Sequence, residues 1–272
     1  MLIKPFILRR LKTDKSIISD LPKKVELNEW VNLSHEQKSL YNKTLDKALT
    51  DISSSPLGQR NGKVLGLLTR LKQICNHPAL LFKEGNVEED FSDRSGKVQR
   101  LIELLEEILE VNDRALIFTQ FAEWGLLLQT YLQKKWQSQI PFLHGGTRKT
   151  DRQEMIDRFQ EDPRGPKIFL LSLKAGGVGL NLTRANHVIH IDRWWNPAVE
   201  NQATDRAYRI GQDNTVIVHK FITTGSLEER KQPGKVGVKP LGIQVQDRVP
   251  DNGYGSEIGS KYKMASQEAY LI

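Results

Sequence analysis

The residues best suited to chemistry lie in one run, from Asn196 to Gln212. If residues 198–210 form a helix, three hydrogen-bonding side chains fall at i, i+4 and i+7, on a face about 60° wide: Gln202, Arg206 and Arg209. Asp205 borders that face. Two guanidinium groups and an amide on one face can grip a polyanion through planar, multi-donor hydrogen bonds. On spacing alone, a solvated helix with local salt bridges is the simpler interpretation.

A separate apolar stripe on the same predicted helix consists of Ala203, Ala207 and Ile210. We expect this stripe to pack against a sheet. Burial of the stripe would leave Arg206 and Arg209 accessible to solvent, with acids such as Asp205 as their local partners.

Three glycines follow a predicted strand, at Gly176, Gly177 and Gly179. Glycine permits tight turns and lets backbone N–H groups approach an anion closely. The spacing does not fit the dinucleotide pattern GxGxxG, and the phosphate-loop pattern GxxxxGK[ST] occurs nowhere in the 272 residues. Taken alone, the segment is as well explained by a strand-to-helix connection as by a ligand site.

Polar residues follow two further predicted strands, in the segments Arg114–Phe121 and Phe142–Thr147. In open α/β sheets, ligands bind beyond the carboxyl ends of the strands. The polar ends of these two strands, the glycine segment after a third strand, and the predicted helix 198–210 should therefore converge on one edge of the sheet. This convergence is the argument for a site.

The elements that would position these residues alternate after Gly96. The predicted strands are 115–119, 140–144, 168–172, 187–192 and 215–221, and the helices between them are near 97–111, 122–135, 149–161 and 198–210. Short apolar strands separated by helices are typical of a parallel sheet covered on both faces. We therefore predict an α/β fold, a doubly wound parallel sheet over residues 96–230.

The rest of the chain divides into three segments. Residues 1–24 are a basic lead-in, and 25–95 are a helical protrusion with a polar, flexible connector at 83–95. Within the protrusion we predict helices at 34–51, where Ser34 and Gln37 suggest a capping box, and at 63–76. Residues 231–272 show no apolar period, and we expect this tail to be poorly ordered.

Composition indicates an ordinary globular protein, with a mean hydropathy of −0.48 and 27% charged residues. A net charge of +7 and a pI near 9.3 suggest nucleic acid, but the excess lies at the two ends of the chain. No run is long and apolar enough for a membrane span, so we expect no membrane partner. The single cysteine, Cys75, excludes an internal disulfide and a cysteine-based metal cluster, and we predict no metal site.

The run from Gln202 to Gln212 closely resembles the last helicase motif of Swi/Snf-type ATPases in helicase superfamily 2. Their consensus reads Q-A-x-D-R-A-x-R-I-G-Q, and every fixed position matches. Further segments resemble other parts of the family in the right order. Residues 5–12 resemble the segment that joins the two lobes, and residues 71–78 resemble part of the inserted helical protrusion. Earlier motifs of the C-terminal lobe are matched at 117–121, 144–146, 172–182 and 195–197. The resemblance covers residues 1–230 and implies a RecA-like lobe preceded by an inserted helical protrusion.

The resemblance also implies roles. Arg206 and Arg209 correspond to arginine fingers that reach the γ-phosphate of ATP across the cleft between two lobes, with Gln202 and Asp205 orienting that face. Residues near the nucleotide would be Gly179 and Asn181, and contacts to the DNA backbone would come from Gln120, Lys174, Gly176 and Gly177. Trp194 and Trp195 could stack on bases, although their place beside an apolar strand end favours burial.

The sequence departs from the family in two respects. It contains neither the phosphate loop nor the D-E-x-H acid pair, which belong to the family's first lobe, so ATP and Mg²⁺ are expected only in a complete two-lobe enzyme. In addition, Pro233 and Gly234 interrupt the helix that normally follows Glu229 and braces the lobes.

Three functions fit this pattern. The first is the C-terminal motor lobe of an ATP-dependent double-stranded DNA translocase, inactive without an N-terminal RecA-like lobe supplied in cis or in trans. The second is a non-enzymatic nucleic-acid or partner-binding module derived from such a motor. The third, a lobe of an RNA helicase, is disfavoured by the R-I-G-Q ending and the helical insert. We expect a monomer that is cytoplasmic and associated with the nucleoid in a prokaryote, or nuclear in a eukaryote.

Overall fold

The computed structural model describes residues 21–175 and 179–229. The basic lead-in up to residue 20, Gly176, Gly177 and the tail from residue 230 lie outside the described residues, and so do Pro233 and Gly234.

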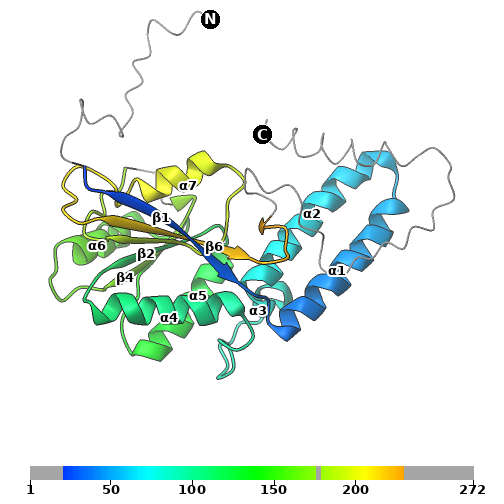
Figure 1. The fold of residues 1–272 in the computed structure, drawn as a ribbon, viewed down its shortest axis with the longest axis horizontal. Coiled ribbons are helices and arrows are strands. Elements are labelled where there is room, and N and C mark those ends of the chain that lie inside the picture. The colour runs from blue at the N-terminus through cyan, green and yellow to red at the C-terminus, as the bar shows by residue number, and fades with distance from the viewer. Residues whose placement is uncertain (1–20, 176–178, 230–272) are drawn as a thin grey trace, which may run out of the picture. The chain divides into compact units, whose positions relative to one another are not determined.

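A six-stranded sheet in which every pair of neighbouring strands is parallel forms the centre of the fold (Figure 1). The strand order is β1-β6-β5-β2-β4-β3. The strands are β1 Lys24–Val31, β2 Ala115–Thr119, β3 Phe142–Leu143, β4 Ile168–Ser172, β5 His187–His190 and β6 Val216–Thr223. The predicted α/β fold with a doubly wound parallel sheet is confirmed.

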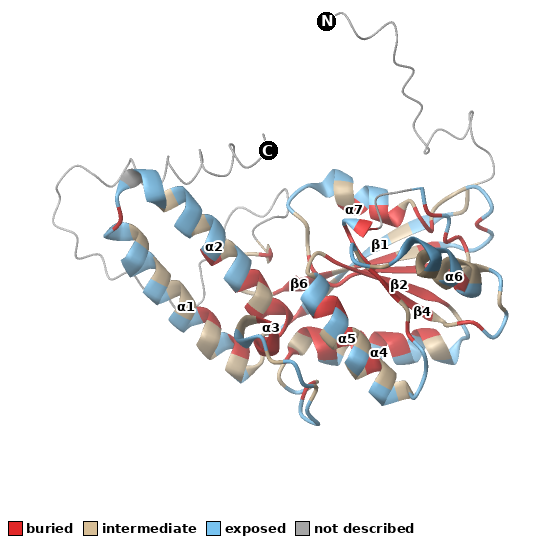
Figure 2. Cartoon of the chain, turned by 180° about the vertical axis from the view of Figure 1, so that it is seen from behind, coloured by how far each residue is buried: buried red, intermediate tan, exposed pale blue. Residues whose placement is uncertain are grey.

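Helices cover both faces of the sheet. On one side lie α4 (Gly96–Glu110) and α5 (Ala122–Trp136), and on the other lie α6 (Lys149–Gln160) and α7 (Pro197–Thr204). Strand β2 shows why a layer of helices is needed on each face of the sheet. Its alternate residues pack in two different hydrophobic cores, one on each face. Ala115 and Ile117 pack in the core that includes α4 and α5, whereas Leu116 and Phe118 pack in the core that includes α6 and α7. Figure 2 shows buried residues along the strands and exposed residues on the outer sides of the helices.

A helical hairpin of α1 (His35–Ser53) and α2 (Leu57–Asn76), followed by α3 (Pro78–Phe82), precedes the main α/β part. The predicted capping box of α1 is present: the Gln37 N–H donates to the Ser34 hydroxyl, and the Ser34 N–H donates to Gln37 Oε1. The Gln37 amide also donates to the carbonyl oxygens of Ile74 and Cys75, at 2.7 and 3.1 Å. It thereby satisfies carbonyl groups at the end of α2 that no helical N–H can reach.

The connector 83–95 is anchored, contrary to the prediction of a flexible segment. Phe91 is 1% exposed and stacks on His77 with a centroid distance of 4.0 Å. Arg94 pairs with both Glu36 and Glu84. The polar composition of the segment does not indicate these contacts, because His77 and Glu36 lie outside it, 14 and 58 residues from their partners in the sequence.

Strand β1 was not predicted. Its residues pair with β6 along their full length, from Lys24 with Val216 to Val31 with Thr223. Only Val31 of the strand is buried, so β1 is an exposed edge strand whose sequence lacks a clear apolar alternation. Residues 24–31 therefore join the sheet rather than the helical protrusion.

Candidate functional site

The carboxyl ends of β2 and β5 meet at Asp192, which is fully buried. Its carboxylate accepts from the Thr119 hydroxyl at 2.6 Å and from the Gln120 backbone N–H at 2.9 Å. It also accepts from the side-chain amide of Asn76, at the end of α2, at 3.1 Å. Burial raises the pKa of Asp192, although the cations and donors around it oppose that rise. The strand ends thus converge, as the sequence predicts, and the Asp192 carboxylate joins them to each other and to the end of α2.

The segment after the glycines is hydrogen-bonded to the turn that follows α7. The Leu182 N–H donates to the Arg206 carbonyl at 2.9 Å, and the Arg209 guanidinium donates to the Leu180 carbonyl at 3.2 Å. The buried amide of Gln212 donates to the carbonyl oxygens of Thr183 and Ala185, at 2.7 and 2.8 Å. Two motifs that lie about 30 residues apart in the sequence thus form one hydrogen-bonded junction, which we call the motif junction.

Helix α7 is shorter than predicted. It begins at Pro197, with the Asn196 side chain accepting from the Ala198 N–H at 2.9 Å, and it ends at Thr204 rather than at residue 210. Arg206 and Arg209 therefore lie in successive turns, not on a helical face with Gln202. The Arg206 carbonyl accepts from Leu182 instead of from the next turn of a helix, so the motif junction replaces the missing helical bonds.

The burial pattern of this turn corrects two further expectations. Ala203 and Ala207 are buried as predicted, but Ile210 is 68% exposed because the chain has left the helix. Arg206, expected to be accessible, is only 3% exposed. Arg209 is half-buried, and Gln202 is exposed on α7.

A third arginine joins Arg206 and Arg209. Burial lowers the pKa of Arg206, and the positive charges of Arg209 and of Arg152 in α6 lower it further. Arg152 also donates to the Ala175 carbonyl at 3.4 Å, beside the glycine segment. Sequence reasoning missed Arg152, because nothing in the pattern of α6 distinguishes it from the other charged residues of that helix. Arg152, Arg206 and Arg209 are hereafter the arginine cluster.

The remaining candidates lie at the same edge of the sheet. Lys174 is exposed directly after β4, and Gly179 and Asn181 are exposed in the loop beyond the glycines. Gly179 has a φ of +52°, a backbone conformation that strains any residue with a side chain. Gln120 is half-buried at the end of β2.

The two tryptophans differ in their surroundings. Trp194 packs against the core that includes α6 and α7, which agrees with the burial that the sequence favours. Trp195 is instead 38% exposed, and the Lys72 ammonium lies 4.1 Å from the centroid of its ring.

The chemistry of the arginine cluster fits a polyphosphate. Three guanidinium groups lie together, with Asp205 as the acid beside Arg206, and those of Arg152 and Arg209 are only partly buried. Guanidinium groups suit planar, multi-donor contacts to phosphate oxygens. Among residues 21–175 and 179–229, no group of three or more His, Cys, Asp or Glu side chains is placed to hold a metal ion. The same residues contain no helix long and apolar enough to cross a membrane.

Comparison with known proteins identifies the family. Residues 96–211 match the helicase conserved C-terminal domain, and residues 1–80 match the SNF2-related domain. The solved C-terminal domain of the Sulfolobus solfataricus SWI2/SNF2 ATPase is 43% identical, with a TM-score of 0.65, over 76% of this chain and 83% of that one. The chain belongs to the SWI2/SNF2 family of ATPases.

Two longer members of the SWI2/SNF2 family extend the comparison. The S. solfataricus SWI2/SNF2 ATPase core, solved in complex with double-stranded DNA, is 46% identical with a TM-score of 0.68, over 84% of this chain and 47% of that one. The putative ATP-dependent helicase/translocase YwqA of Bacillus subtilis (strain 168) is 48% identical over 84% of this chain and 24% of its own length. The chain thus spans about a quarter of the curated relatives that it matches.

Proposed function

We propose that this chain is the C-terminal motor lobe of an ATP-dependent double-stranded DNA translocase. In this proposal Arg206 and Arg209 contact the γ-phosphate of ATP held by an N-terminal RecA-like lobe. Gln120, Lys174, Gly176 and Gly177 contact the DNA backbone. Support comes from the family, whose members include an ATP-dependent helicase/translocase and a core solved on double-stranded DNA.

The motif junction is the observation that carries the proposal. It ties the turn bearing Arg206 and Arg209 to the loop bearing Gly179 and Asn181 through hydrogen bonds, so that the two segments are held beside each other. Fixed donors act on developing negative charge without a cost of reorganisation at the moment of reaction. The hydrogen bond from Arg209 to Leu180 and the burial of Arg206 provide such fixation.

ATP with Mg²⁺ supplies the phosphoryl group that is transferred to water. The residues of this chain that would hold it are the arginine cluster, Gly179 and Asn181, with Gln202 and Asp205 beside them. The 272 residues contain neither a phosphate loop nor a D-E-x-H acid pair, so the metal ion and the β- and γ-phosphates must be held by another lobe. We therefore propose that the chain alone turns over no ATP.

The test compares DNA-stimulated ATP turnover by the purified chain, by an N-terminal lobe from a related ATPase, and by a mixture of the two. We expect turnover in the mixture only. DNA binding by the chain, combined with a mixture that stays inactive, would instead support a non-enzymatic binding module. Turnover by the chain alone that is lost in Arg206→Ala would contradict the proposal.

A further inference from the structure

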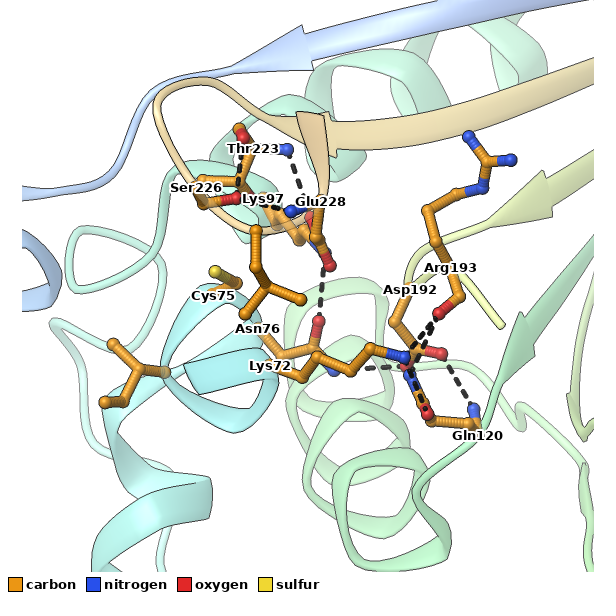
Figure 3. Close-up of polar contacts among 12 residues, drawn as sticks. Lys72, Cys75, Asn76, Lys97, Gln120, Asp192, Arg193, Thr223, Ser226 and Glu228 are labelled. Atoms are coloured by element: carbon orange, nitrogen blue, oxygen red, sulfur yellow. Dashed lines mark hydrogen bonds and ion pairs between the residues drawn. The ribbon is translucent and has the colours of Figure 1, made fainter. Parts of the chain in front are cut away.

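Lys72 is a buried cation that the proposed function does not use. It lies in the last turns of α2, within the helical protrusion, and is only 1% exposed. Its ammonium donates to the Arg193 carbonyl at 2.8 Å and to Gln120 Oε1 at 3.3 Å (Figure 3). Burying a charged group is costly unless it is hydrogen-bonded, so these hydrogen bonds stabilise the buried Lys72 ammonium at the carboxyl ends of β2 and β5.

The contact with Gln120 fixes which way its amide faces. An ammonium group only donates, so Gln120 must turn its oxygen toward Lys72. Gln120 Nε2 then points elsewhere and makes a long hydrogen bond of 3.4 Å to the Arg193 carbonyl. The other Nε2 hydrogen has no acceptor within the part of the chain that the structure describes. A phosphate oxygen only accepts, so with this orientation Gln120 would offer a DNA phosphate the donor that it requires.

The same ammonium also holds the next aromatic side chain. It lies 4.1 Å from the ring centroid of Trp195, within the range of a cation–π interaction. Trp195 is 38% exposed, so its ring is accessible to solvent while the cation contacts it. One buried lysine thus touches both the residue after β2 and the loop after β5.

A second residue of α2 reaches this edge from the same side of the helix. Asn76, one turn after Lys72, donates to Asp192, and its carbonyl group accepts from the Ser95 hydroxyl. Its side-chain oxygen accepts from Lys97, which pairs with Glu228 (Figure 3). The end of α2 is therefore joined by buried hydrogen bonds to the ends of β2 and β5.

We propose that Lys72 is a positioning residue for the DNA-contacting edge, which sets the amide of Gln120 and the ring of Trp195 from the helical protrusion. This inference rests on the proposed role of Gln120 at DNA. It assigns to the protrusion a function beyond that of an inserted helical element, because the geometry of the edge then depends on a side chain from α2.

A double-mutant cycle tests the proposal through dissociation constants for a labelled DNA duplex at fixed low salt. The proteins are the wild type, Lys72→Met, Gln120→Ala and the double variant. We expect Lys72→Met to weaken binding by about threefold to tenfold, which corresponds to the loss of one hydrogen bond. In the Gln120→Ala background the same change should cost less than about twofold, because Lys72 acts through Gln120. Lys38→Met, which removes an exposed charge from α1, is the control for net charge.

Tryptophan fluorescence gives a second readout that a general loss of stability would not mimic. The contribution of Trp195 is the difference between each protein and its Trp195→Phe counterpart, and we expect its emission maximum to shift in Lys72→Met. If Lys72→Met does not fold, Lys72→Gln takes its place in the fluorescence comparison, because it removes the charge beside Trp195 but keeps a hydrogen-bond donor.

Three results would overturn the proposal. These are an effect of Lys72→Met no larger than that of Lys38→Met, a full effect in the Gln120→Ala background, and an unchanged Trp195 emission. Absence of duplex binding by the wild type would contradict the proposed function instead, and the fluorescence comparison would still decide whether Lys72 positions Trp195.

Discussion

Lys97 and Glu228 form an ion pair of 2.9 Å in which both side chains are completely buried. Lys97 lies in the first turn of α4, and Glu228 lies in the turn after β6, where its second oxygen accepts from the Thr223 N–H at 3.1 Å. The pair fixes the segment that follows the last strand to the helix that begins the main α/β part.

Removal of either partner alone should destabilise the protein strongly. Glu228→Gln or Lys97→Met leaves a buried charge without its partner, and we expect each to lower the free energy of unfolding by about 3–5 kcal/mol. The double variant Lys97→Met/Glu228→Gln should lose much less than the sum of the two. Urea unfolding measures all three.

The exposed pair Lys135–Glu106 is the matched control for this prediction. Its atoms are 3.0 Å apart, but the two side chains are 32% and 54% exposed. Lys135→Met should therefore change the free energy of unfolding by no more than about 1 kcal/mol. Equal effects at the two pairs would show that Lys97 and Glu228 do not form the interaction described.

Stability should fall in acid because of His190. Burial lowers the pKa of this fully buried histidine to about 4, from an ordinary value of 6.5. Between these two values the unfolded chain binds a proton that the folded chain does not, so the free energy of unfolding decreases as the pH falls from 6.5 to 4. The loss attributable to His190 is at most about 3 kcal/mol.

Chemical unfolding at pH 7.5, 5.5 and 4.5 tests the role of His190. His190→Asn removes the titrating group and should flatten part of the pH dependence, whereas His35→Asn, at an exposed position of α1, should not. The buried His187 and His219, whose pKa values burial also lowers, should account for a further part. An unaltered slope in His190→Asn would contradict the assignment.

Binding to DNA should weaken steeply with salt. Contacts to phosphates release counterions, so the logarithm of the binding constant falls linearly with the logarithm of salt concentration. Lys174 is exposed beside the glycine segment, and Lys174→Ala should reduce the slope by about one unit. Lys134→Ala, on α5 at the other face of the sheet, should leave the slope unchanged. Binding that is insensitive to salt would rule out backbone contacts as its main source.

The bounds of an element could be predicted closely where its own residues show the apolar pattern or the cap that defines it. Strands β2 and β4 have the expected bounds, 115–119 and 168–172, because each is a short apolar run buried on both faces. The capping box at Ser34 was also predictable, because both of its partners lie within one turn. In these cases the local pattern and the tertiary structure demand the same conformation.

Features created by distant contacts could not be predicted in this way. Strand β1 exists through its pairing with β6, about 190 residues later in the chain. Helix α7 ends at Thr204, and the Arg206 carbonyl beyond it accepts from Leu182, a contact that no periodicity reveals. The burial of Arg206 likewise depends on tertiary packing. Arg152 and Lys72 reach the carboxyl ends of the strands only when α6 and α2 are packed in the fold.

The burial of Arg206 changes what its substitution should do. Loss of a buried, well-contacted side chain typically costs about 1–3 kcal/mol, so we expect Arg206→Ala to be measurably less stable than the wild type. Arg209 is half-buried, so Arg209→Ala should lower the free energy of unfolding by less than Arg206→Ala does. Unfolding curves for both variants must accompany any measurement of activity, so that turnover is compared between folded proteins.

The most direct test of the proposed motor lobe is DNA-stimulated ATP turnover in a mixture with an N-terminal lobe, measured for the wild type, Arg206→Ala and Arg209→Ala at a temperature where all three are folded. Arg158→Ala, on the exposed side of α6, is the control. We expect Arg206→Ala to lower turnover by about 10³-fold or more, as the loss of an arginine finger does. The control should retain full turnover. Full turnover by a folded Arg206→Ala protein would show that Arg206 is a structural residue and would contradict the account.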